Sequence, residues 1–287
     1  MSAVSAADKA AVIQGSEKSM HAGVMSTSLA AAGLEQAFER AAEIGAEALA
    51  VAYVAENDAK LLDKDGHPAV LKKLAADHGL SIPALNLLWL CEKPSLITQS
   101  SARDPAVRSI TQALNVAAEI GAQAVIVPFY GKNTIELEDE LTRAAESLLS
   151  AIDAAAETGV AIGIESTLNF EQHQFLLEYL GNTDQAGACL DIGTAASRKL
   201  DVPTGIRTLG AASIVQIHVK DVRTAEGQPP NFDVTLGEGD VDFRPIAQAL
   251  RAVGYDGWLM LETPPGPDAI AAARANLQFM RRELVND

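Results

Sequence analysis

A segment near the start of the chain is repeated almost letter for letter further on. Residues 41–51 read AAEIGAEALAV, and residues 117–127 read AAEIGAQAVIV. Each copy predicts the end of a helix, a glycine that can adopt the left-handed conformation, and an apolar strand. The copies begin at residues 41 and 117, and so lie two units of about 38 residues apart. This spacing is typical of successive strand–helix units in an eightfold barrel.

Looser copies of this helix, glycine and strand pattern recur later in the chain. Residues 154–159 precede the apolar run 160–164, and residues 250–254 precede the run 258–261. Such short runs are typical of strands buried on both faces of a parallel sheet. The sequence therefore predicts an α/β protein, a (β/α)8 TIM barrel. Its eight predicted strands are residues 20–25, 48–54, 82–88, 124–129, 160–165, 187–191, 214–219 and 258–262.

The chain is long enough for one such barrel. It has 287 residues, of which 48% are hydrophobic, and no linker rich in Pro, Gly or Ser divides it. We expect residues 18–287 to form a single domain and residues 1–17 to form a poorly ordered N-terminal tail. The tail lacks the basic and apolar regions of a signal peptide, and no later run could span a bilayer. These features predict a cytoplasmic protein with no membrane partner.

Charge and motif content disfavour several classes of function. The formal net charge of −16 disfavours a nucleic-acid partner, because nucleic acids are bound through basic surfaces. No Gly-rich phosphate-binding loop occurs, so no nucleotide cofactor is predicted, and no Ser-centred nucleophile elbow occurs either. The two cysteines, Cys91 and Cys189, lie in apolar runs and are expected to be buried free thiols in a reducing compartment.

Four consecutive predicted strands each end on a residue that can bind a metal. These residues are Glu165, Asp191, His218 and Glu262. A single strand-end carboxylate is usually just solvated, and a histidine in a buried run is more often a hydrogen-bonded core residue. On successive strands of a closed barrel, however, the four side chains would converge at the C-terminal mouth. Three carboxylates would repel one another without a cation, and together with a neutral imidazole they suit one divalent metal ion.

Several motifs resemble the sugar isomerase/epimerase family of TIM barrels, also called xylose isomerase-like barrels. The resemblance runs from Met20 to the C-terminus and is strongest over residues 160–262. Each motif is weak alone, but their order is fairly specific for the family. The motifs are Ile164-Glu165, Leu190-Asp191-Ile192-Gly193, His218-Val219-Lys220-Asp221, Gly237-Glu238-Gly239 with Asp242-Phe243, and Gly254-Tyr255-Asp256-Gly257 before Leu261-Glu262.

The resemblance implies a metal-dependent isomerase or epimerase that acts on a small ketose or inosose. Glu165, Asp191, His218 and Glu262 would hold one divalent ion, most often Mn²⁺, with Mg²⁺, Co²⁺ or Zn²⁺ as alternatives. Glu165 and Glu262 would be catalytic: one would remove the proton next to a carbonyl and the other would return it through an enediolate. The partner would be a small sugar or polyol ketone, and a homo-oligomer is compatible with the family.

The chain departs from the family close to the proposed metal. Many members carry an Asp-x-Gly-His motif whose histidine contacts the substrate, but here Thr194 takes the place of the histidine. Other candidate substrate contacts are Arg223, His173, Trp89, Lys220 and Glu238. Plainer roles are open for most of them: His173 on the first turn of an exposed helix, Lys220 in a surface ion pair or in ordering a loop with Asp221, Glu238 in a glycine turn, and Trp89 in packing.

Three alternative functions are left open by the sequence. A lyase such as inosose dehydratase would share the first proton abstraction, but it needs a general acid, for which His173, Lys220 and Glu238 are candidates. A non-catalytic sugar-binding barrel would explain the missing histidine, although all four ligands are kept. The DNA-repair enzyme endonuclease IV shares the barrel but needs several metal-binding histidines and a basic surface, which this acidic chain with five histidines does not offer.

Overall fold

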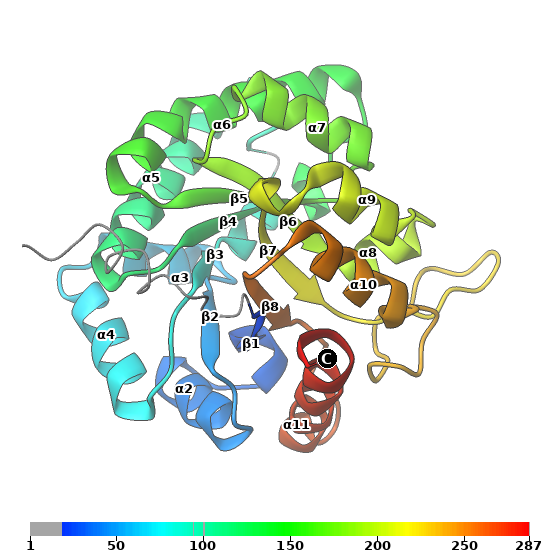
Figure 1. Ribbon diagram of the computed structural model, residues 1–287. Helices are drawn as coiled ribbons and strands as arrows, with labels where there is room; N and C mark the ends of the chain where they lie inside the picture. Colours follow the sequence, from blue (N-terminus) through cyan, green and yellow to red (C-terminus); the bar gives the residue numbers. More distant parts are fainter. Residues whose placement is uncertain (1–18, 94, 100, 287) are drawn as a thin grey trace, which may run out of the picture.

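Eight parallel strands close into a barrel in which consecutive strands pair and β1 pairs with β8 (Figure 1). The computed structural model describes residues 19–93, 95–99 and 101–286, so the predicted N-terminal tail lies outside the described residues. The predicted (β/α)8 barrel is confirmed. The strands are β1 (His21–Met25), β2 (Ala48–Ala52), β3 (Ala84–Asn86), β4 (Ala124–Phe129), β5 (Ala161–Ser166), β6 (Ala186–Asp191), β7 (Ile214–Val219) and β8 (Trp258–Leu261).

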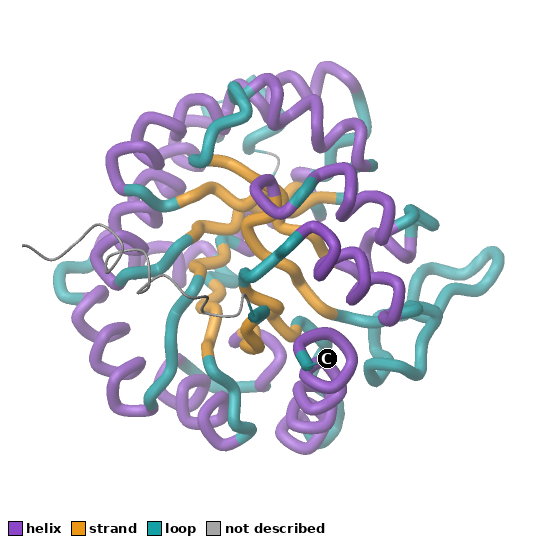
Figure 2. Tube along the Cα trace, viewed as in Figure 1, coloured by secondary structure: helices purple, strands orange, loops and turns teal. Residues whose placement is uncertain are grey.

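Helices surround the barrel and lead from one strand to the next (Figure 2). The α-helices are α2 (Leu34–Glu43), α3 (Glu56–Ala59), α4 (His67–His78), α5 (Arg103–Ile120), α6 (Glu138–Thr158), α7 (Phe170–Tyr179), α8 (Ile192–Ser197), α9 (Val202–Leu209), α10 (Phe243–Val253) and α11 (Ala269–Met280). Short 3-10 turns are η1 (Ser26–Leu29), η2 (Lys60–Asp63), η3 (Leu88–Glu92), η4 (Gly131–Asn133) and η5 (Ala211–Ser213). A π-helical turn, η6 (Arg281–Val285), follows α11.

The sequence repeat corresponds to two equivalent turns between a helix and a strand. Helices α2 and α5 end just before Gly45 and Gly121, and both glycines have a φ of 78°. In each copy the residue after the glycine donates its amide hydrogen to a carbonyl of the last helical turn, over 3.0 and 2.8 Å. Glycine adopts this left-handed conformation without the steric cost of a Cβ atom. The repeated letters therefore encode the point at which each helix turns back towards the barrel.

Strand β3 is shorter than the predicted span of 82–88. Regular pairing is confined to Ala84–Asn86. Pro83 has no amide hydrogen to donate to a neighbouring strand, and the chain turns into η3 at Leu88. The C-terminal end of this strand therefore falls at Asn86.

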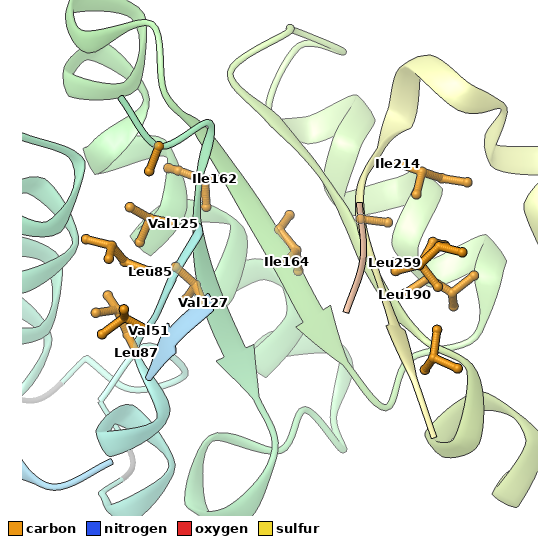
Figure 3. Packing of buried hydrophobic residues seen from close by; sticks show 14 of the residues in the cluster. Val51, Leu85, Leu87, Val125, Val127, Ile162, Ile164, Leu190, Ile214 and Leu259 are labelled. Atoms are coloured by element: carbon orange, nitrogen blue, oxygen red, sulfur yellow. The ribbon is translucent and has the colours of Figure 1, made fainter. Parts of the chain in front are cut away.

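Alternate residues of the strands face the helices and the barrel interior. The helix-facing side chains belong to one large apolar core, of which Leu85, Val125 and Ile162 are examples (Figure 3). The interior side chains form two small separate clusters, Ala84 with Ala124, Ile126 and Cys189, and Met25 with Ala50 and Met260. Since side chains alternate with a period of two, the next interior positions towards the C-terminal mouth are mostly polar.

These interior positions at the mouth lie in two layers. When the strand register is followed around the barrel, with a stagger of about one residue per strand, the odd-numbered strands supply Met25, Asn86, Glu165 and His218 to one layer. The even-numbered strands supply the layer above it, made of Ala52, Pro128, Asp191 and Glu262. Glu262 continues β8, because its amide donates to the carbonyl of Val219 over 3.0 Å. All four predicted metal ligands therefore occupy adjacent layers at one end of the barrel.

Candidate active site

Three carboxylates meet at the C-terminal mouth of the barrel. Glu165, Asp191 and Glu262 each offer an oxygen, and the three oxygens lie within 4.8 Å of one another. Glu165 and Asp191 are buried, and the Glu262 side chain is 12% exposed. Asp191 and Glu262 also line a pocket of about 680 Å³, together with Tyr130, Thr167, Thr194, Ser197, Arg198, Lys220, Pro230 and Phe232.

His218 joins this group through one ring nitrogen. Its Nδ1 lies 3.0 Å from Oε1 of Glu165 and 3.3 Å from Oε2 of Glu262. The other nitrogen, Nε2, lies 2.8 Å from Nε2 of the buried Gln216 side chain. Gln216 therefore fixes the orientation of the imidazole through Nε2, and Nδ1 is the nitrogen that faces the carboxylates. Burial alone would lower the pKa of His218, but Cys189 and the two glutamates raise it well above its usual value.

Lys220 places an ammonium group against the same carboxylates. Its Nζ lies 2.8 Å from Oδ2 of Asp191 and 2.9 Å from Oε2 of Glu262. The ring of Phe232 covers the ammonium, with 5.4 Å between Nζ and the ring centroid. A Cβ atom at Gly193 would collide with Lys220, so this glycine permits the close approach. Lys220, one of the residues predicted to contact substrate, thus lies in the site and is not a surface residue paired with Asp221.

The carboxylates of Glu165 and Glu262 have opposite pKa shifts in this environment. Burial raises the pKa of Glu165 above the usual range of glutamate. Burial also opposes ionisation of Glu262, but Lys220 and His218 lower its pKa overall. Because the three acids lie so close together, the protonation of each depends on the cations that balance their charge.

Thr194, at the position where the resemblance predicts a histidine, fixes the orientation of Asp191. Asp191 caps the N-terminus of α8: its Oδ1 accepts from the Thr194 amide over 3.0 Å, and its Oδ2 accepts from the Thr194 hydroxyl over 2.8 Å. The same Oδ2 contacts Lys220. One carboxylate therefore serves as both a helix cap and a candidate ligand.

The structure does not place the other predicted substrate contacts in the lining of this pocket. His173 is buried on α7, not exposed, and its Nε2 lies 2.9 Å from the Ser166 hydroxyl. Arg223 is exposed and donates to the main-chain carbonyl of Glu238, which is also exposed. Trp89 is mostly buried in η3. Substrate contact by these four residues stays a prediction.

The loop between β7 and α10 is held by Asp221, which was considered for a loop-ordering role. Its side chain is fully buried, and its two oxygens accept from the amides of Val222, Gly237, Gly239 and Val241 over 2.8 to 3.1 Å. A Cβ atom at Gly239 would collide with this carboxylate. The loop projects beyond the ring of helices, in yellow and orange in Figure 1. It also carries Phe232 to its position above Lys220.

Two residues outside the predicted ligand set, Tyr130 and Cys189, also reach the site. The Tyr130 hydroxyl donates to Oε2 of Glu165 over 3.3 Å. The Cys189 thiol lies within 4.8 Å of ligand atoms of Glu165 and His218, and burial raises its pKa to about 12. Both follow from the period of two, since Tyr130 lies two residues beyond Pro128 and Cys189 two residues before Asp191.

The donor set fits a divalent cation. Three closely spaced carboxylates, two of them buried, are destabilised by their mutual repulsion unless positive charge is supplied. Carboxylate oxygens suit hard ions such as Mg²⁺ and Mn²⁺, and an imidazole nitrogen extends the range to Co²⁺ and Zn²⁺. Glu165, Asp191, Glu262 and Nδ1 of His218 are the groups that could hold such an ion.

Comparisons with known proteins give a consistent result. The model of the xylose isomerase-like TIM barrel family matches residues 38–283. The chain is 28% identical over 220 residues to a putative L-ribulose-5-phosphate 3-epimerase, SgbU, of Escherichia coli K12, covering 73% of this chain and 76% of that one. It is 27% identical over 259 residues to a 2-epi-5-epi-valiolone 7-phosphate 2-epimerase of an Actinoplanes species, covering 87% and 90%.

A solved structure confirms the likeness of fold. The 3-keto-D-glucoside 4-epimerase YcjR of E. coli superimposes with a TM-score of 0.74 over 92% of this chain and 99% of that one, at 17% identity.

Within the described part of the chain, no helix combines the length and apolar character that a bilayer crossing requires.

Proposed function

Because the chain belongs to the xylose isomerase-like TIM barrel family, we propose that it is a divalent-metal-dependent sugar isomerase or epimerase. Its substrate would be a small ketose or inosose. The observation that carries this proposal is the meeting of Glu165, Asp191 and Glu262 with Nδ1 of His218, next to the pocket that Asp191 and Glu262 line. Relatives that are named as epimerases of a ketose phosphate and of a cyclitol phosphate support the same class of reaction.

The reaction requires removal of a proton from a carbon next to a carbonyl. A bound Mn²⁺ or similar ion, held by Glu165, Asp191, His218 and Glu262, would supply the Lewis acidity that makes such a carbon acid easier to ionise. The residues of the chain then have to position the substrate, exclude water and move the proton.

Glu165 and Glu262 are suited to the proton transfers. They come from β5 and from the end of β8, in different layers of the barrel, and both contact His218 Nδ1. Tyr130 donates to Glu165, whereas Lys220 contacts Glu262, so each carboxylate is oriented by a different partner. One glutamate would remove the proton and the other would return it, which inverts the carbon if the two act on opposite faces.

The pocket wall suits a polyhydroxylated substrate. Thr167, Thr194 and Ser197 are hydroxyl-bearing residues of the lining, and Lys220 adds a cation. Hydroxyl groups can both donate and accept hydrogen bonds, as sugar hydroxyls do. The volume of about 680 Å³ is in the range of small-molecule sites.

Isotope exchange provides the test. Purified protein loaded with Mn²⁺ should exchange the hydrogen at the α-carbon of a ketose such as D-fructose or L-ribulose with deuterium from D₂O, detected by NMR. Removal of the metal with a chelator should abolish the exchange, and re-addition should restore it. Full-rate exchange by metal-free protein would refute the metal-dependent reaction.

A lyase reaction is the second candidate. Of the three general acids considered from the sequence, Lys220 lines the pocket, whereas His173 and Glu238 do not. The ammonium of Lys220 could protonate a leaving hydroxyl group after the shared proton abstraction. An inosose that yields an enone absorbing in the ultraviolet would identify dehydration, and epimer formation without such absorbance would identify isomerisation.

A further inference from the structure

One buried amide in the barrel has no visible role in the fold. Asn86, the last residue of β3, is completely buried, and neither Nδ2 nor Oδ1 of its side chain has a hydrogen-bond partner among the described residues. Buried amides that make no hydrogen bonds destabilise a protein, because they lose their contacts with water without compensation. An unpaired group of this kind therefore needs an explanation outside the fold.

The position of Asn86 connects it to the active site. Leu85 and Leu87 belong to the core that faces the helices, as Figure 3 shows, and Ala84 belongs to an interior cluster. The side chain of Asn86 therefore faces the barrel interior. There it shares a layer with Glu165 and His218, directly below the layer of Asp191 and Glu262.

The neighbours of Asn86 in the sheet cannot satisfy its amide. Its register partners are Ala52 on β2 and Ile126 on β4, and neither has a polar side chain. Asn86 thus offers an unused donor and an unused acceptor in the barrel interior, in the layer of Glu165 and His218.

We propose that Asn86 is a further substrate-binding residue, whose carboxamide holds an oxygen of the polyhydroxylated ketone that reacts above Glu165 and Glu262. This inference rests on the proposed function. A carboxamide can donate from Nδ2 and accept at Oδ1, so it matches a hydroxyl group in either sense. Binding of substrate would satisfy an amide that the fold leaves unpaired.

Replacement of Asn86 should weaken the binding of substrate without lowering the stability of the protein. Asn86→Leu keeps the branched shape of the side chain and removes two unsatisfied polar atoms, so the melting temperature should stay equal or rise. The same variant should bind Mn²⁺ as the wild type does by calorimetry, but its KM for the ketose should rise about tenfold, the loss expected for one hydrogen bond.

Asn133 provides a matched control, because it is also a completely buried asparagine but is fully hydrogen-bonded. Its Oδ1 accepts from the amides of Ser95 and Leu96, and its Nδ2 donates to the carbonyls of Leu90 and Lys93. Asn133→Leu should therefore lower the melting temperature clearly.

Two outcomes would overturn the role of Asn86. The first is a loss of stability in Asn86→Leu comparable to that of Asn133→Leu, which would mean that the amide is satisfied within the fold, for instance by a buried water. The second is an unchanged KM in a stable Asn86→Leu. The stability comparison needs no substrate, so it stands even if wild-type protein exchanges no ketose hydrogen, a result that would instead refute the proposed function.

Discussion

The ammonium of Lys220 lies between Asp191 and Glu262, 2.8 Å from one carboxylate and 2.9 Å from the other. A side chain of the protein thus places positive charge against two of the three acids that we propose as metal ligands. Burial opposes the charge on Lys220, but Asp191, Glu262 and Glu165 raise its pKa well above the usual value. The ammonium and a divalent ion would therefore compete for the same negative charge.

Replacement of Lys220 by methionine should tighten metal binding. The substitution removes a positive charge that repels the incoming ion, so the Kd for Mn²⁺ should fall by about tenfold or more. Isothermal titration of chelator-treated protein measures this directly. Lys72→Met is a suitable control, since Lys72 is exposed and lies 3.6 Å from Glu119 on the helical surface. Equal or weaker binding by the Lys220 variant would show that the ammonium supports the ligands and does not compete with the ion.

The glutamates that we propose as catalytic should differ from exposed glutamates in the effect of mutation. Glu165→Gln should lower the rate of ketose hydrogen exchange on the order of 10²- to 10⁴-fold, because the amide cannot accept the proton. The rate should be compared at saturating Mn²⁺, since the variant also loses a negative ligand. Glu119→Gln, at an exposed residue of α5 outside the pocket, should retain the wild-type rate. Comparable losses in both variants would contradict the assignment.

Asp221 should control the order of the loop between β7 and α10. Asp221→Ala removes the acceptor of four main-chain hydrogen bonds and should lower the free energy of unfolding by roughly 2–4 kcal/mol. Urea denaturation measures the loss, and faster proteolytic cleavage within residues 222–241 would locate it. Asp233→Ala, an exposed residue of the same loop, should change neither quantity. Wild-type resistance to protease in Asp221→Ala would disprove the role.

Burial of His173 should make the free energy of unfolding fall in mild acid. Burial lowers its pKa to about 4, whereas an unfolded chain has the usual value of 6.5. Between these values the unfolded state binds a proton that the folded state does not, so acidification from pH 7 towards pH 4 favours unfolding. Above pH 6.5 the neutral His173 does not reduce the free energy of unfolding. Near pH 4 the reduction reaches roughly 3 kcal/mol. Unfolding of His173→Gln should depend less steeply on pH over this range, and an unchanged slope would refute the account.

Much of the barrel could be predicted from local patterns in the sequence. The glycines at residues 45 and 121 mark equivalent helix ends, and the apolar runs before Glu165 and His218 are strands in the structure. Metal-type residues at the ends of successive strands also predicted that the carboxylates would meet, because the C-terminal ends of parallel barrel strands converge. These features depend on local sequence and on the closure of parallel strands into a barrel.

Other features of the site depend on contacts between distant parts of the chain. Arg223 lies just after β7, but Asp221 gathers the loop amides so that the Arg223 guanidinium is directed to a carbonyl at the surface. The position of Lys220 was open to prediction from the alternation of side chains beyond His218. The two ion pairs of Lys220 could not be predicted, because they require Asp191 from another strand and the space that Gly193 leaves.

Asp221 fixes the start of the loop between β7 and α10 to the barrel. The loop is held by its peptide groups, which donate to Asp221, and by its buried Val234 and Leu236 side chains. Its exposed side chains can therefore be exchanged with little effect on this attachment. Phe232 shows that a residue of this segment can nevertheless reach the reaction pocket. Substrate range in such a protein can therefore diverge through this one exchangeable segment while the acids beneath it stay the same.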